Sequence, residues 1–193
     1  MIKPAVSRLA RGLVRLGLGA NQVTLAGFGI GVIAFVLIAN RLYGIGVTAI
    51  FLSRILDALD GAVARLSQPT DRGAFLDIGL DFLFYASIPL AFALADPPRN
   101  ALAAAVLLAA FMGTSTIFLA FAVLAAKRGL RSAAYPDKSF YFLGGLTEAT
   151  ETLTCFAAMC LWPQHFAIFA CIFAALCLVT IVTRIWWGWR TFV

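Results

Sequence analysis

Long apolar runs alternate with short polar stretches along the whole chain. A helix needs about 20 apolar residues to cross the roughly 30 Å of hydrocarbon in a bilayer. Apolar residues within the runs are continuous and do not alternate with polar ones, which argues against membrane strands. The pattern therefore predicts an all-α integral membrane protein with six transmembrane helices, at residues 21–40, 42–66, 72–95, 101–126, 141–162 and 165–187.

The segment before the first apolar run has a different pattern. On a helix, Arg8, Arg11 and Arg15 share one face, whereas Leu9 and Leu13 lie on another. A basic face opposite an apolar face is typical of a helix that lies in the headgroup plane of a membrane. The sequence therefore predicts an amphipathic N-terminal interfacial helix.

Composition supports a membrane protein. Hydrophobic residues make up 62% of the chain and charged residues only 12%, which leaves too little polar surface to cover a soluble domain. No repeat, low-complexity segment or linker divides the sequence. Residues 1–193 are therefore expected to form one membrane domain, with the interfacial helix at 1–20 and the six-helix bundle at 21–193.

Basic residues are distributed unevenly among the polar segments. Of the 15 Lys and Arg residues, Arg41 and Arg99 alone fall in segments expected to face outward. Because cytoplasmic loops collect Lys and Arg, both termini are predicted to face the cytoplasm, in an inner (cytoplasmic) membrane. This topology and the anionic lipid of the inner leaflet explain the net charge of +6, so no nucleic-acid partner is required.

Acidic residues fall where membrane helices normally exclude them. Such side chains are costly at depth unless they face a cavity or a partner, so each one is a candidate functional residue. The chain has nine acidic residues, and those within or at the edge of predicted spans are Asp57, Asp60, Asp77, Asp81, Glu148 and Glu151.

The four aspartates are predicted to face one another. At about 100° per residue, Asp57 and Asp60 share a face of the second span, and Asp77 and Asp81 share a face of the third. Four carboxylates in a low dielectric repel one another unless positive charge lies among them. One or two divalent cations would supply that charge, and ligands that are all oxygen favour Mg²⁺ or Mn²⁺ over zinc.

Small and basic residues lie on the same two stripes: Arg54, Gly61, Ala64, Arg65 and Gly73. The small residues leave room for a bulky ligand to approach the backbone, or they serve as helix-packing contacts. The two arginines offer an alternative to a metal site, in which each neutralises one aspartate and the remaining acids reach water.

Together these residues form a recognisable pattern, Asp57-x-x-Asp60-Gly61-x-x-Ala64-Arg65, then seven residues, then Gly73-x-x-x-Asp77-x-x-x-Asp81. The pattern resembles the signature of the CDP-alcohol phosphatidyltransferases, integral membrane enzymes of phospholipid synthesis. Every signature position is filled, and the predicted topology extends the resemblance over essentially the whole chain. The stretch SFYFLGGLTE at 139–148 is also similar to bacterial members described as phosphatidylglycerophosphate synthase-like.

The resemblance implies an activity, a cofactor and a set of site residues. The family transfers the phosphatidyl group of CDP-diacylglycerol to an alcohol and releases CMP. Asp57, Asp60 and Asp77 would hold a pair of Mg²⁺ or Mn²⁺ ions, and Asp81 would help to ligate them and act as general base. The nucleotide and diphosphate would contact Gly61, Ala64, Arg65, Gly73, Asn21 and Thr24. Asn21 is equally well explained as the N-cap of the first span.

The signature does not assign the acceptor alcohol. A phosphorylated acceptor of the glycerol 3-phosphate type requires basic groups beside the site, yet the fourth span has none before Lys127. Glu148 and Glu151, one helical turn apart in the fifth span, suit an unphosphorylated polyol or amino alcohol, or else bond neighbouring helices. Candidate acceptor residues are therefore Arg54, Lys138, Glu148 and Glu151.

Two other functions compete with the enzyme. A catalytically inactive member acting as a membrane binding or scaffold protein is expected to have a damaged signature, and this one is intact. A cation-coupled transporter also uses intramembrane acids, but the spans lack inverted-repeat symmetry and the acids gather near one face. The resemblance further implies a homodimer, because members of this family often pair through their membrane helices.

Overall fold

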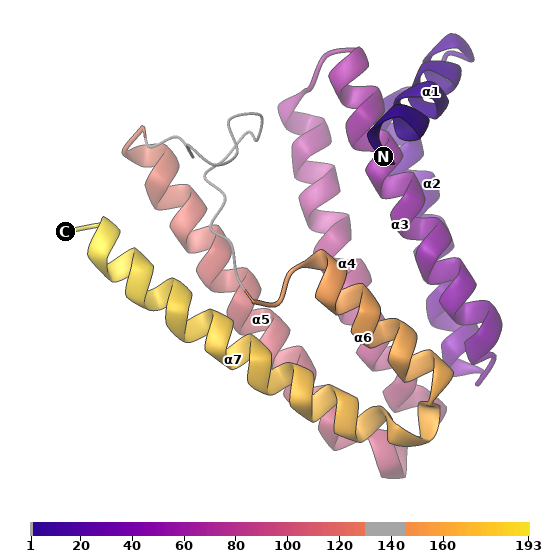
Figure 1. Ribbon diagram of the computed structural model, residues 1–193, viewed down its shortest axis with the longest axis vertical. Helices are drawn as coiled ribbons and strands as arrows, with labels where there is room; N and C mark the ends of the chain where they lie inside the picture. Colours follow the sequence, from indigo (N-terminus) through magenta and orange to yellow (C-terminus); the bar gives the residue numbers. More distant parts are fainter. Residues whose placement is uncertain (1, 130–145) are drawn as a thin grey trace. The chain divides into compact units, whose positions relative to one another are not determined.

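The computed structural model describes residues 2–129 and 146–193, and every regular element among them is helical (Figure 1). The all-α prediction is therefore confirmed. Five of the six predicted spans agree closely with a helix, and the exception is 141–162. The helices are α1 (Ile2–Arg15), α2 (Ala20–Ala39), α3 (Tyr43–Leu66), α4 (Asp71–Ala95), α5 (Pro97–Lys127), α6 (Ala149–Leu161), the short 3-10 helix η1 (Pro163–His165) and α7 (Phe166–Thr191).

Four of the described helical segments are long and apolar enough to cross a membrane: α2, α4, α5 and η1 with α7. Helix α3 has 24 residues, which is long enough, but four charged side chains lie between Arg54 and its C-terminal end. Helix α6 has 13 residues, fewer than the roughly 20 that a span needs. The prediction of six spans is therefore not confirmed, and the charged α3 and the short α6 account for the difference.

Residues Met1–Pro97 form one compact unit that contains α1 to α4. Helix α2 packs against both α3 and α4 in this unit (Figure 1). Glycines permit this close packing, because a Cβ atom at Gly27 would lie 3.2 Å from Cβ of Leu56 on α3. At Gly31 the Cβ atom would lie 2.7 Å from Cδ2 of Phe84 on α4. Small residues thus bring the three helices close enough for the aspartates of α3 and α4 to meet.

Helix α1 packs on α3 through a small apolar cluster. Ala10 is fully buried and packs against the buried Ala62 and Val63 of α3. Val6 and Leu13 of α1 are partly buried and pack against the same cluster. The three arginines of α1 are exposed. A helix is thus observed at the N-terminus, but Leu9 of the predicted apolar face is 58% exposed, so an amphipathic helix in the headgroup plane stays a prediction.

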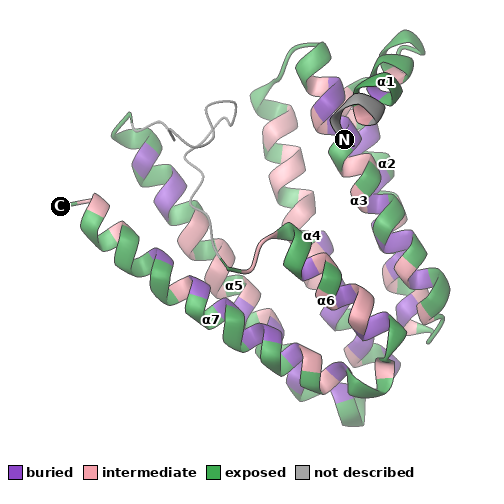
Figure 2. Cartoon of the chain, viewed as in Figure 1, coloured by how far each residue is buried: buried purple, intermediate pink, exposed green. Residues whose placement is uncertain are grey.

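Residues Pro98–Val193 form the second compact unit. Phe111 of α5 meets Phe156 of α6 and Phe173 of α7 edge to face, with ring centroids 6.2 and 6.1 Å apart. The N–H of Thr147, just before α6, donates to Oγ1 of Thr180 on α7 at 3.2 Å. Many apolar side chains of α5 and α7 are exposed, as expected for helices that face lipid (Figure 2). The expectation of a single domain over 1–193 stays a prediction.

Candidate metal centre

The turn between α3 and α4 sets the register of the aspartates. Helix α4 begins at Asp71, and its N-cap Thr70 accepts a hydrogen bond from the N–H of Gly73 at 3.1 Å. A threonine hydroxyl at this position satisfies one of the free N–H groups of the first turn. With its start fixed in this way, α4 presents Asp77 about 1.7 turns later, toward α3.

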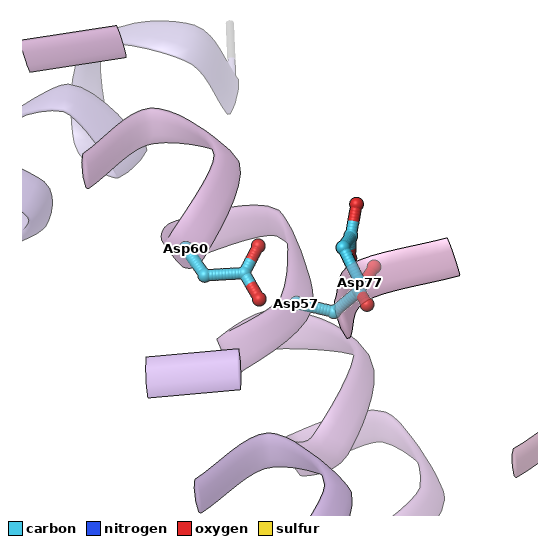
Figure 3. Close-up of side chains that lie close together, drawn as sticks. All are labelled: Asp57, Asp60 and Asp77. Atoms are coloured by element: carbon cyan, nitrogen blue, oxygen red, sulfur yellow. The ribbon is translucent and has the colours of Figure 1, made fainter. Parts of the chain in front are cut away.

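Three of the four signature aspartates come together. Asp57 and Asp60 of α3 and Asp77 of α4 each offer a carboxylate oxygen, and these oxygens all lie within 4.8 Å of one another (Figure 3). Asp60 is only 4% exposed. Three carboxylates this close repel one another strongly unless a cation lies among them, so the arrangement suits a bound ion.

The hydrogen bonding of the buried Asp60 carboxylate indicates whether a metal ion fits at this position. Its Oδ2 atom is buried and has no hydrogen-bond partner among the described residues, and an unsatisfied buried charge is costly. A hard divalent cation with oxygen ligands would satisfy it. The three-carboxylate group therefore fits Mg²⁺ or Mn²⁺, in agreement with the chemistry expected from the sequence.

Asp81 has a different partner. Its Oδ1 atom accepts a short hydrogen bond from Nη1 of Arg54, and the same Nη1 lies 3.3 Å from Oδ1 of Asp57. Arg54 is largely buried, with its side chain 10% exposed. The ion pairing considered as an alternative to a metal thus exists for Arg54, but among the described residues no basic side chain forms an ion pair with Asp60 or Asp77.

A small open pocket joins these residues to α2. Thr24, predicted to contact the nucleotide, lies in its wall beside the acids. The pocket is lined by Thr24, Gly27 and Phe28 of α2, by Arg54 and Asp57 of α3, and by Asp77, Leu80 and Asp81 of α4. The site therefore involves three helices of the first unit.

Asn21 contacts the signature glycine of α4. A Cβ atom at Gly73 would lie 3.0 Å from Oδ1 of Asn21, so the missing side chain admits the asparagine. The interpretation of Asn21 as an N-cap is wrong, because Gly19 occupies that position and its N–H is bonded by Oε1 of Gln22 at 2.9 Å. Asn21 thus lies beside the signature and not at the cap.

The other predicted nucleotide residues lie near the C-terminal end of α3. Ala64 is half-buried and Arg65 is exposed. A Cβ atom at Gly61 would meet only Nη1 of Arg65, at 3.5 Å, so the surface above Gly61 is open except for this flexible side chain. Their predicted role in binding nucleotide and diphosphate stays a prediction.

The candidate acceptor residues come from different parts of the chain. Arg54 lies among the acids, and Lys138 lies outside the described residues. Glu148 is the N-cap of α6 and not part of a transmembrane helix over 141–162, because α6 begins at Ala149. Its N–H donates to Oε2 of Glu151 at 3.2 Å, which gives Glu151 a local role in capping.

Sequence reasoning missed the residues that surround Arg54. Its Nη2 donates to Oγ of Ser53 at 3.3 Å, and its guanidinium carbon lies 3.9 Å from the ring centroid of Phe84 and 5.6 Å from that of Tyr85. Both rings follow Asp81 by one helical turn, a spacing that could have placed them on the same side of α4.

Comparisons with known proteins agree with the signature. A family model described as CDP-alcohol phosphatidyltransferase matches residues 18–189. The inner membrane protein YnjF of Escherichia coli (strain K12) is 52% identical over 190 residues, which cover 98% of this chain and 92% of that protein.

Solved structures share the fold. The structure of Mycobacterium tuberculosis phosphatidylinositol phosphate synthase with CDP-DAG bound is 25% identical, with a TM-score of 0.75 over 95% of this chain and 93% of that one. The same synthase in complex with manganese and citrate gives a TM-score of 0.74 at 25% identity, over 95% of this chain and 88% of that one.

Proposed function

Because the chain belongs to the CDP-alcohol phosphatidyltransferase family, we propose that it transfers the phosphatidyl group of CDP-diacylglycerol to an alcohol. The alcohol oxygen forms a new bond to the phosphorus that carries the diacylglycerol, the bond from this phosphorus to CMP breaks, and CMP leaves. The observation that carries the proposal is the meeting of Asp57, Asp60 and Asp77, together with a buried oxygen of Asp60 that has no hydrogen-bond partner among the described residues. An inactive scaffold protein has no need to retain this costly arrangement.

Asp57, Asp60 and Asp77 would hold the divalent cation, and we propose a pair of Mg²⁺ or Mn²⁺ ions in the working enzyme. When bound, such ions neutralise charge on the diphosphate oxygens and on the leaving CMP. The manganese complex of the similar synthase supports a metal of this kind.

Asp81 acts as the general base in this proposal and helps to ligate the ions. A base must lie within hydrogen-bond reach of the acceptor hydroxyl, at about 2.6–3.2 Å. Asp81 lines the open pocket, and its side chain is 33% exposed, so one carboxylate can both meet substrate and receive its proton.

The chain's other signature residues bind and orient the donor. Thr24 shares the pocket with the acids, and Arg65 offers a planar fork that suits diphosphate oxygens. Small side chains at Gly61, Ala64 and Gly73 leave space for the nucleotide, and Asn21 lies against Gly73. CDP-DAG in the similar synthase supports this class of donor.

The proposed enzyme spans the inner membrane six times, with both termini and the active site facing the cytoplasm, and it forms a homodimer. Helix α3 crosses despite its charges because a site for ions and diphosphate compensates them. The name of the similar Escherichia coli protein supports the inner membrane.

The acceptor belongs to one of two classes. Lys138 and Arg54 would contact a phosphorylated acceptor, whereas Glu148 and Glu151 would contact an unphosphorylated polyol or an amino alcohol. Arg54 is the basic side chain nearest the acids, and two carboxylates already engage it.

Purified protein in detergent, incubated with radiolabelled CDP-diacylglycerol, tests the proposal directly. Mn²⁺ or Mg²⁺ and a panel containing glycerol 3-phosphate, inositol phosphate, glycerol, inositol, serine and ethanolamine should yield CMP and one labelled lipid. EDTA should abolish both products. CMP release that persists in EDTA would exclude the metal centre, and no CMP with any acceptor would favour the scaffold function.

A further inference from the structure

Helix α1 ends in a cap that fixes its direction. The N–H of Leu18 donates to the carbonyl oxygen of Leu13 at 3.0 Å. The N–H of Gly17 donates to the carbonyl oxygen of Val14, also at 3.0 Å. Gly17 has a φ of 78°, a left-handed conformation that glycine adopts without strain. These two bonds around a left-handed glycine form a Schellman motif, which stops a helix sharply, so α1 is a separate element with a defined end.

Helix α1 supports the end of α3 that carries the signature. Ala10 is fully buried and packs against Ala62 and Val63, which directly follow Asp60 and Gly61 in the sequence. At 100° per residue, Ala62 lies about 160° around α3 from Asp60, so α1 backs the helix on the side away from this aspartate. The side chains at the centre of the contact are small and bury little apolar area. The docking of α1 on α3 therefore gains from any further contact that holds α1 in place.

The exposed surface of α1 carries two adjacent stripes. Leu9 is 58% exposed and Leu16 is 78% exposed, and the two lie about 20° apart around the helix. Three exposed arginines, Arg8, Arg11 and Arg15, lie within about 60° of one another and beside the leucines. An apolar stripe next to a basic stripe suits a helix whose leucines enter the acyl chains while its arginines reach the lipid phosphates. This surface therefore fits a membrane leaflet with anionic headgroups.

We propose that the exposed side of α1 binds an anionic phospholipid surface and that this contact holds α1 against α3, so that turnover rises with the anionic-lipid content of the leaflet. The inference rests on the proposed function, because the contact supports the proposed site on α3. Neutral lipid accepts the leucines but offers the arginines no net counter-charge. Near an anionic surface each arginine contributes about a fivefold gain in binding, and salt screens this gain.

Hydrogen–deuterium exchange of the full-length chain in lipid nanodiscs tests the lipid contact without substrate. Discs of phosphatidylcholine alone are compared with discs that contain about 30 mol% of the anionic lipid phosphatidylglycerol. In the anionic discs the backbone amides of α1 should exchange at least about tenfold more slowly, and those at the C-terminal end of α3 should also slow. Salt at about 0.5 M should remove most of this difference. A difference that persists in that salt overturns the role of charge.

Two double variants, each lacking two positive charges, test which basic residues act. Arg8→Gln/Arg15→Gln should lose the effect of phosphatidylglycerol on exchange. Lys127→Gln/Arg190→Gln changes exposed residues of the second unit and should retain it. Equal exchange in the two lipids overturns the inference, as does an equal loss in both double variants. Protection of α1 in neutral discs that increases with the number of chains per disc overturns it too, since the partner is then a second copy.

The variant Ala10→Leu tests the link from α1 to the site. Ala10 is fully buried, so the larger side chain should displace α1 from α3 while its exposed arginines still bind lipid. Phosphatidylglycerol should then slow exchange in α1 alone and should no longer raise CMP release, which should rise at least about twofold in the wild-type protein. Slower exchange in α3 of this variant, or wild-type CMP release that does not respond to the lipid, overturns the link.

The exchange measurements use no CDP-lipid. A wild-type protein that shows the lipid effect on exchange but releases no CMP with any acceptor therefore refutes the proposed function and not the lipid contact of α1.

Discussion

Gly31 of α2 lies beside Phe84 and Ser53, two residues that contact Arg54 in the candidate site. A Cβ atom there would lie 2.7 Å from Cδ2 of Phe84 and 3.3 Å from Oγ of Ser53. Phe84 is 1% exposed, so its ring cannot swing away without displacing other core residues. Replacing Gly31 by alanine therefore forces α2 and α4 apart or strains the aromatic side chain.

Two opposing effects set the magnitude for Gly31→Ala. Overpacking a well-packed core typically costs about 1–3 kcal/mol, while replacing a helical glycine by alanine contributes about 0.5–1 kcal/mol of stability. The net loss should be about 0–2.5 kcal/mol. Gly29, two residues away, has no atom within 4 Å of its Cβ position apart from its chain neighbours and the backbone of its own helix. Gly29→Ala should therefore retain or gain stability, and it is the matched control.

Unfolding of both variants by SDS in mixed detergent micelles measures this difference. Because Phe84 lies beneath Arg54, Gly31→Ala should also reduce CMP release at saturating substrate, whereas Gly29→Ala should not. If the two variants unfold alike and release CMP at the same rate, then α2 does not pack on α4 as described, and Phe84 does not support the site.

Three other changes test separate parts of the structure. Asp60→Asn removes a charged ligand, so the Mn²⁺ affinity measured by titration should fall by more than about tenfold. The metal-free protein should be no less stable. An equal fall in Mn²⁺ affinity in the exposed Asp71→Asn would point to a general charge effect. Thr70→Ala removes the N-cap of α4 and should lower the free energy of unfolding by about 0.5–2 kcal/mol, whereas Thr70→Ser should not. If the Ala and Ser variants are equally stable, the Thr70 hydroxyl does not cap the helix. Glu151→Gln retains an oxygen that can accept a hydrogen bond from the N–H of Glu148, so the free energy of unfolding should change by less than about 0.5 kcal/mol. The KM for the acceptor should rise. An unchanged acceptor KM would mean that this side chain only caps α6.

The sequence alone determined most of the helices and the stripes of residues within them. Continuous apolar runs and the 100° rotation per residue are local properties, so the register of Asp57 with Asp60, and of Asp77 with Asp81, follows from spacing. Helix α4 was expected at 72–95 and is found at Asp71–Ala95. The all-oxygen character of the site also follows from residue types. What spacing cannot supply is the distance between two helices, which depends on the side chains packed between them.

Only the tertiary structure decided how the acids divide. Close packing of α2 on its neighbours at Gly31 and Phe84 places Arg54 beside Asp81 and leaves the other three aspartates facing one another. In the sequence all four acids are equivalent, since each lies on an inward stripe. The end of α6 shows the same limit: Glu148 looks like a residue inside an apolar run, yet its N–H is bonded by Oε2 of Glu151 and the helix starts after it. Pairing across helices and the exact start of a helix are settled by contacts between segments, and a one-dimensional pattern does not contain these contacts.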